Sequence, residues 1–261
     1  MEKTERPKSK YFRLMQTVAV SGGALVINTL ITLLLVPMIT DTLGSDAYGF
    51  VTLGKNIAQY AMMITAALNS FAARYIVVAY HKNDQREARM FFTSTFYGDL
   101  FLGTALFAVA AGCTFQLEKL LVIPEKLVLD VQLLFLFVFL NFWLVTISTA
   151  FSASAHIKNK LYIAGIFKTL SYVGEAAVLI ICFRFFPPHV FYVGLGLAVA
   201  AFVTAMGNWS ICRRYTPELK VEERYFSFWA IRHLVVDGVW TSLNSLGDAL
   251  NSGLDLLICN L

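Results

Sequence analysis

The stretch VQLLFLFVFLNFWLVTISTAFS, residues 131–152, contains no Asp, Glu, Lys or Arg. Its apolar side chains run on almost continuously, whereas a helix that lies on a soluble core keeps them to one face. A helix rises about 1.5 Å per residue, so about 20 apolar residues cross the roughly 30 Å hydrocarbon core of a bilayer. The stretch therefore predicts a membrane-spanning helix.

Five other stretches of the chain are similar in length and composition. The six predicted spans are residues 18–39, 50–73, 91–113, 131–152, 162–186 and 190–212, and a seventh apolar stretch begins near Val235. Over all 261 residues, 57% are hydrophobic and 15% are charged, against about 25% charged in soluble domains. The predicted fold class is all-α, a polytopic transmembrane helical bundle with one six-helix lobe and the start of a seventh helix.

The connections between these spans are short and rich in turn residues, so no soluble domain fits between them. We expect a cytoplasmic N-terminal tail, a six-helix lobe, a cytoplasmic linker, and the start of a seventh span beyond which the second lobe is truncated. These parts are residues 1–17, 18–212, 213–234 and 235–261. The aromatic and basic end of the linker fits either a short interfacial amphipathic helix or an ordinary aromatic belt.

Basic residues alternate between the two sides of the predicted spans. Of the 21 Lys and Arg residues, 15 lie in the N-terminal tail and in the connections after the second, fourth and sixth spans. Only Lys119 and Lys126 lie in connections on the opposite side. Because cytoplasmic loops are enriched in Lys and Arg, the asymmetry predicts a cytoplasmic N-terminus. We expect a multi-pass protein of the bacterial cell (inner) membrane.

Sequence features of soluble enzymes and of nucleic-acid-binding proteins are missing. The chain has no Gly-rich phosphate loop, HExxH, GxSxG or DxD, and its basic residues form no continuous patch. The four cysteines form no CxxC pair and lie within or at the ends of apolar stretches, where we expect buried thiols. The sequence predicts no catalytic residue, no metal, no cofactor and no nucleic-acid partner.

Charged residues inside the predicted spans are the candidates for function, because each costs about 2.5 to 3.5 kcal/mol at a helix centre on insertion scales. They are Asp99 in the third span, Lys168 and Glu175 in the fifth, and Asp248 and Asp255 in the seventh. Lys168 and Glu175 share a face but are two turns apart, too far to assume a direct ion pair. They bracket a polar site, or Lys168 reaches the headgroups and Glu175 pairs with a neighbouring helix.

Two further polar faces follow from helical spacing. In the seventh span Asn244, Asp248, Asn251 and Asp255 lie within an arc of roughly 60°, and we expect this stripe to face the bundle interior or a second lobe. Hydrogen bonds between helices are the alternative use of the stripe. Polar residues such as Lys55 and Asn69 dilute the second span. Helical spacing there aligns Thr52, Asn56, Gln59, Met63, Ser70 and Arg74 on one face. A snorkelling anchor is the alternative for Arg74.

Two loose motifs carry a family resemblance. The first is LVPMITDTLGSDAYGFVTL, residues 35–53, and the second is NSLGDALNSGLDLLICNL, residues 244–261. Together with the basic inward loops they resemble polysaccharide transporters of the Wzx type, N-terminal half. These belong to the multidrug/oligosaccharidyl-lipid/polysaccharide flippase superfamily, with the MATE and MurJ-like transporters.

The resemblance implies two six-helix lobes around a cavity, and transfer of a polyprenyl-diphosphate-linked oligosaccharide, such as an O-antigen or lipopolysaccharide repeat unit, to the outer leaflet by alternating access. A missing C-terminal lobe or a second copy would supply the other half. Membrane lipid and a coupling ion are further expected partners. Lys55, Arg74 and Lys168 would then meet the anionic headgroup, and Asp99, Glu175, Asp248 and Asp255 would line the path or bind the coupling cation.

Other functions fit the same residues. An ion-coupled exporter of small cations would use the acidic stripe of the seventh span, and fold does not decide between substrates. A membrane-bound polysaccharide polymerase or ligase would act on related substrates, although the outward connections here are short for such an enzyme. An assembly partner without transport activity is the third alternative.

Overall fold

The computed structural model describes the backbone of residues 7–120 and 123–259, and the side chains of residues 15–44, 47–118 and 123–248. Within these ranges the chain is helical without a β-strand, as the sequence predicts. The α-helices are α1 (Pro7–Leu43), α2 (Ser45–Asn69), α3 (Ala72–His81), α4 (Gln85–Thr114), α5 (Leu117–Leu120), α6 (Val128–Ile157), α7 (Leu161–Phe185), α8 (Phe191–Tyr215) and α9 (Phe228–Cys259). Two short 3₁₀ helices are η1 (Glu125–Leu127) and η2 (Glu223–Tyr225).

Six segments of the described chain are long and apolar enough to cross a membrane. They are Met15–Leu43, Ala47–His81, Gln85–Thr114, Glu125–Ile157, Leu161–Phe185 and Phe191–Tyr215, and each contains most of one predicted span. Large apolar side chains on these helices point outward; Phe101 is 78% exposed and Leu34 is 73% exposed. Lipid, unlike water, is a favourable surrounding for such side chains. The predicted polytopic helical bundle is confirmed.

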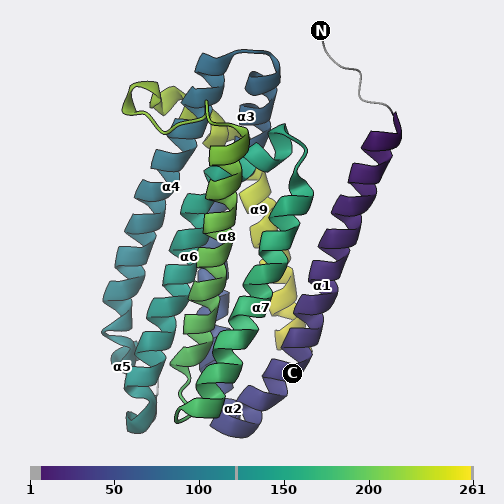
Figure 1. The fold of residues 1–261 in the computed structure, drawn as a ribbon. Coiled ribbons are helices and arrows are strands. Elements are labelled where there is room, and N and C mark those ends of the chain that lie inside the picture. The colour runs from purple at the N-terminus through teal and green to yellow at the C-terminus, as the bar shows by residue number, and fades with distance from the viewer. Residues whose placement is uncertain (1–6, 121–122, 260–261) are drawn as a thin grey trace.

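The long helices run side by side along one axis, and their connections gather at two ends (Figure 1). One end holds the start of α1 and the connections 82–84, 158–160 and 216–227, which carry most of the basic residues outside the helices. We call it the basic end, and the opposite end the far end. The alternation of basic connections along the sequence thus becomes a separation in space.

At the far end, α1 passes into α2 through a tight turn at Gly44. Gly44 has a φ of 88°, in the left-handed region that a Cβ disfavours, and its amide donates to the carbonyl of Thr40 at 2.9 Å. Pro37 lies inside α1 and lacks an amide hydrogen, which removes one helical hydrogen bond. At this end of the bundle α1 turns toward α2 (Figure 1).

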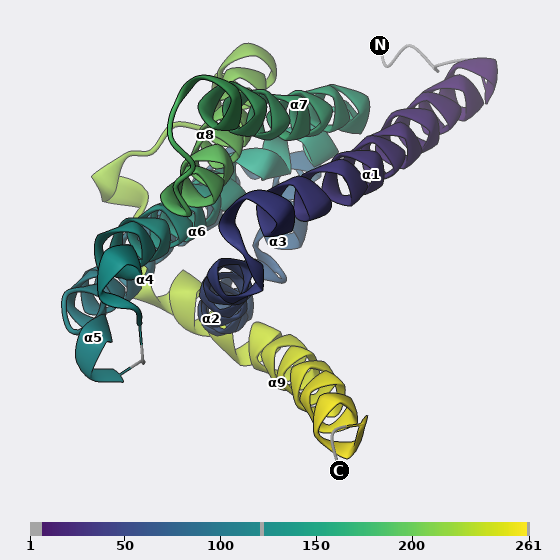
Figure 2. The same ribbon diagram turned by 90° about the horizontal axis from the view of Figure 1, so that it is seen from below.

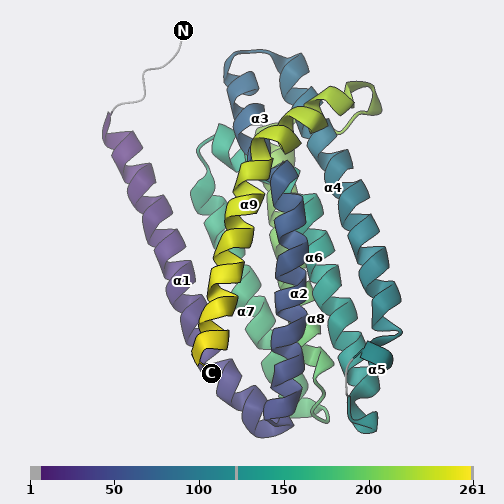
Figure 3. The ribbon, with the colours of Figure 1, turned by 180° about the vertical axis from the view of Figure 1, so that it is seen from behind.

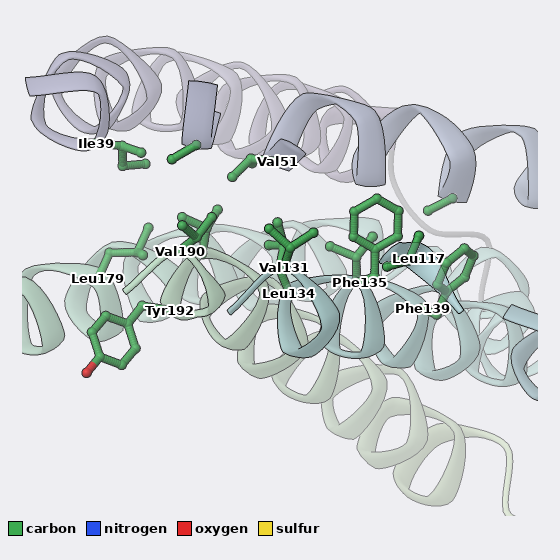
Figure 4. Packing of buried hydrophobic residues seen from close by; sticks show 14 of the residues in the cluster. Ile39, Val51, Leu117, Val131, Leu134, Phe135, Phe139, Leu179, Val190 and Tyr192 are labelled. Atoms are coloured by element: carbon green, nitrogen blue, oxygen red, sulfur yellow. The ribbon is translucent and has the colours of Figure 1, made fainter. Parts of the chain in front are cut away.

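Two apolar clusters hold the helices together. The far-end cluster joins α1 and α2 to α6, α7 and α8, with Ile39 and Val51 on one side and Leu179, Val131 and Leu134 on the other (Figure 4). The second cluster, at the basic end, joins α3 and α4 to α6, α8 and the start of α9. Fully buried side chains in it include Ile76, Phe92 and Leu234.

Three details differ from the sequence-based expectation. The second span is two helices, α2 and α3, because the chain turns at Ser70, whose hydroxyl donates to the carbonyl of Ala66 at 2.5 Å. The last helix begins at Phe228, inside the predicted linker, so the aromatic and basic stretch is part of α9. Cys113 is exposed near the far end of α4 and is not the buried thiol that was expected, whereas Cys212 is buried.

Candidate functional site

Two helices, α2 and α7, present polar and cationic side chains outside the packed core. On α2 these are Lys55, Asn56 and Gln59, and on α7 the exposed residue Lys168 is one of them. In the view along the bundle (Figure 2), α1 and α7 lie on one side of α2 and α9 lies on the other. The helices α1 and α9 diverge from each other. We call Lys55, Asn56, Gln59, Lys168 and Glu175 together the open face.

Glu175 is the acidic member of the open face and is only partly exposed. It lies on α7 where α8 packs against it; a Cβ added to Gly196 of α8 would lie 3.3 Å from Glu175 Cγ. The positive charges that act on its carboxylate come from Lys55 of α2 and Lys168 of α7. The tertiary structure therefore adds Lys55, from the second span, to the surroundings of Lys168 and Glu175, which share the fifth span.

These three groups form no direct ion pair. Among the described side chains, the ion pairs within 4 Å are His189 with Asp130 and Arg224 with Glu222, and neither involves the open face. Lys168 instead lies over the ring of Tyr172, with Nζ 5.1 Å from the ring centroid. The lysine ammonium groups thus keep hydrogen-bonding capacity for another anion, such as a phosphate group.

Asp99 lies elsewhere, in the packed interior between α4 and α2. It is fully buried, and Asn69 Nδ2 at the end of α2 donates to its Oδ1 at 2.9 Å. Asp99 Oδ2 and Asn69 Oδ1 are both buried without a hydrogen-bond partner among the described residues. The structure thus gives Asp99 a partner on another helix, and Asn69 is a residue that sequence reasoning had treated only as diluting the second span.

The remaining candidates are dispersed. Arg74 is exposed on α3 near the basic end, with its guanidinium carbon 5.9 Å from the ring centroid of Phe71, a position that fits the anchoring alternative. Asn244 and Asp248 are exposed on α9 and not buried in the bundle. Asn251 and Asp255 lie outside the part of the chain whose side chains are described. A second lobe as the neighbour of this stripe stays a prediction.

Sequence reasoning missed a hydrogen-bonded junction between α3 and α9. The Tyr75 hydroxyl donates to Asp237 Oδ2, and Trp229 stacks on His233 with ring centroids 4.5 Å apart. Tyr75 and Asp237 are 162 residues apart in the sequence. No short-range pattern indicates such a pair.

A second network at the basic end was missed as well. Tyr80 donates to Glu218 Oε1, and Lys158 Nζ donates to the Tyr80 oxygen at 2.8 Å. Burial raises the pKa of the Glu218 carboxyl, but the hydrogen bond from Tyr80 and the charges of Lys158 and Arg89 outweigh it. The pKa of Glu218 therefore lies below its ordinary value, and the carboxylate holds the segment after α8 against α3.

The helical membrane fold agrees with the protein family that a comparison with known proteins assigns to the chain. A family model described as "Polysaccharide biosynthesis protein" matches residues 14–261. The chain belongs to this family, which confirms the resemblance to polysaccharide transporters of the Wzx type.

The chain is also similar to a curated protein, the uncharacterized membrane protein EpsK of Bacillus subtilis (strain 168). The two are 26% identical over 238 residues. The alignment covers 91% of this chain and 47% of EpsK, so the chain spans about half the length of that relative.

Proposed function

We propose that this chain forms one lobe of a flippase that moves a lipid-linked oligosaccharide from the cytoplasmic to the outer leaflet of the cell membrane. The observation that carries the proposal is that the positive charges of Lys55 on α2 and Lys168 on α7 both act on the carboxylate of Glu175. Family membership in polysaccharide biosynthesis supports the substrate class.

The chemistry of the open face suits a phosphorylated headgroup. Both lysines are exposed on apolar helices, where an unpaired charge is costly unless it faces a wet cavity or a ligand. An ammonium group binds phosphate as a point charge without fixed orientation, so it can hold a group that must move on. Glu175 limits the net positive charge and so keeps the anion from being held too tightly.

The sugar and diphosphate would follow this polar face while the polyprenyl tail stays in lipid. No bond is made or broken in such a transfer. Alternating access needs a second body that rocks against this lobe, supplied by a C-terminal lobe or by another copy of the chain. The splay of α1 and α9 on either side of α2 leaves the open face available to that body (Figure 2).

The test replaces both lysines by glutamine in the complete gene product, expressed in cells that depend on it for surface polysaccharide. The amount of polysaccharide exported should fall roughly tenfold for each charge-assisted contact that is lost. Lipid-linked oligosaccharide should accumulate on the cytoplasmic side, and arginine at both positions should restore part of the activity. Both quantities are measured by labelled-sugar extraction after equal expression has been checked by immunoblot.

The matched control is Arg184→Gln, which removes an exposed cation from the far end of α7 and should leave export unchanged. Normal surface polysaccharide in the double lysine variant would remove the open face from the path. Export of organic cations with unaltered lipid-linked sugar would favour the multidrug-exporter alternative.

A further inference from the structure

A basic pocket lies at the basic end of α4. It has a volume of about 500 Å³ and is lined by Gln85, Arg86, Arg89, Arg224 and Tyr225. Arg224 is paired with Glu222 at 2.7 Å, but no ion pair within 4 Å is found for Arg86 or Arg89 among the described side chains. Arg89 Nε is buried without a hydrogen-bond partner there. The pocket therefore offers unused donors and positive charge to an anion.

An apolar pocket lies further along the same helix. It has a volume of about 400 Å³, and no polar atom contributes to its exposed lining. Its walls come from α2, α4, the start of α9 and the segment before α9. Figure 3 shows α2, α4 and α9 side by side, with the first turns of α9 crossing toward α4. Phe101 and Phe228 in this wall are 78% and 73% exposed, on the outer surface of the bundle.

The two pockets are parts of one column. Gln85 and Arg89 line the first, and Tyr97 and Phe101, about two and three turns further along α4 than Arg89, line the second. Across from them, Tyr225 lines the basic pocket and Phe226 the apolar one.

Two contacts hold the wall opposite α4 in place. The backbone amide of Ser227 donates to Ser94 Oγ at 2.9 Å. The rings of Phe226 and Tyr97 pack edge to face, with their centroids 5.9 Å apart. The column is thus a built feature of the packed chain.

The dimensions of the column match one leaflet of a bilayer. Arg89 and Phe101 are twelve positions apart on α4, which is about 18 Å of helix. Half of the hydrocarbon core of a bilayer is about 15 Å thick. A lipid whose phosphate lies at the arginines would therefore have its chain in the apolar pocket.

We propose that this column binds an anionic phospholipid from the surrounding leaflet, phosphate to the arginines and one acyl chain between α4 and α9. The positive charge of the basic pocket favours an anionic headgroup. The basic end is predicted to be cytoplasmic, so the pocket would lie in the leaflet that carries anionic lipid. The column lies across α2 from α7 and its Lys168, so it is separate from the proposed transport path (Figure 2). Lipid bound there bridges α4 and the start of α9.

The test is native mass spectrometry of the full chain in detergent, titrated with phosphatidylglycerol, phosphatidylcholine or polyprenyl phosphate. Phosphatidylglycerol should bind more tightly than phosphatidylcholine. The double variant Arg86→Gln/Arg224→Gln should weaken phosphatidylglycerol binding roughly twentyfold, since each basic residue near an anionic surface contributes about a fivefold effect. Arg214→Gln, an exposed arginine at the same end outside the pocket, is the matched control and should retain affinity.

A second variant probes the apolar half without touching a charge. Ile64→Trp should fill the apolar pocket and lower phosphatidylglycerol binding, whereas Ile180→Trp, on the exposed surface of α7, should not. An equal loss of phosphatidylglycerol affinity in a test variant and in its matched control would overturn the proposal. Unchanged affinity in both the double arginine variant and Ile64→Trp would also overturn it. Tighter binding of polyprenyl phosphate than of phosphatidylglycerol would also overturn it and assign the column to the substrate. Because transport is not measured, failure here leaves the proposed function untouched.

Discussion

The junction of α3, α4 and α9 and the open face of α2 and α7 contain the same kinds of residue and use them differently. At the junction Tyr75 is bonded to Asp237, and the amide of Ser227 is bonded to Ser94. On the open face Lys55 and Lys168 are exposed and without an ion-pair partner among the described side chains. A polar group with a fixed partner stabilises a packed fold, while one without a partner is available to a ligand.

The largest predicted effect comes from the close approach of α9 to α2. A Cβ at Gly238 would clash with the backbone carbonyl of Ala67, which cannot move aside as a side chain can. Gly238→Ala should lower the free energy of unfolding by about 3 kcal/mol. Thermal unfolding in detergent measures this loss of stability. Gly247→Ala on the same helix meets nothing within 4 Å and should instead be neutral or stabilising by up to about 1 kcal/mol.

The next effect concerns the buried pair of Asn69 and Asp99. Asn69→Leu removes the donor to a fully buried carboxyl and should cost about 2 kcal/mol of unfolding free energy. Replacing Asp99 by leucine as well should recover most of the loss, because neither polar group then remains buried. Both values come from chemical denaturation in detergent. No recovery in the double variant would show that Asp99 has a further essential contact.

A smaller effect is expected from the hydrogen bond between α3 and α9. Tyr75→Phe keeps the ring on Phe91, whose centroid is 4.9 Å away, and removes only the hydroxyl that donates to Asp237. The loss should be about 1 kcal/mol, typical of one hydrogen bond inside a helical membrane bundle. A double-mutant cycle with Asp237→Asn isolates the pair. Additive losses in the cycle would mean that the two side chains are not coupled.

The smallest effect is pH-dependent and lies outside the spans, at Glu218. Its pKa in the folded chain is below the ordinary value of 4.5, so its contribution to stability is complete above that value. As the pH falls below 4.5 and through the folded-state pKa, the carboxylate is protonated and the contribution is lost. The difference in melting temperature between the wild type and Glu218→Gln should therefore shrink from pH 7 to pH 4. A constant difference would contradict this role.

The contrast between the two regions also shows how far prediction from sequence reached. The spans were predictable because length and continuous hydrophobicity are local properties, and the turn at Gly44 follows from one residue type. Helical spacing predicts which polar residues of the last span share a face, but it does not supply their partners, such as Tyr75 for Asp237. Asn69 looked unfavourable in an apolar span until the structure placed Asp99, 30 residues away, beside it.

The sequence by itself determined that the chain crosses a membrane several times, because bilayer thickness and backbone hydrogen bonding leave long apolar helices no other stable arrangement. Only the tertiary structure decided which polar groups are paired with one another and which face outward. Helix packing brings distant positions together through the shapes of many side chains at once. Lys168 and Glu175 share one face of a span in the sequence itself, and only the folded chain brings the positive charge of Lys55, from another helix, to act on Glu175 as well.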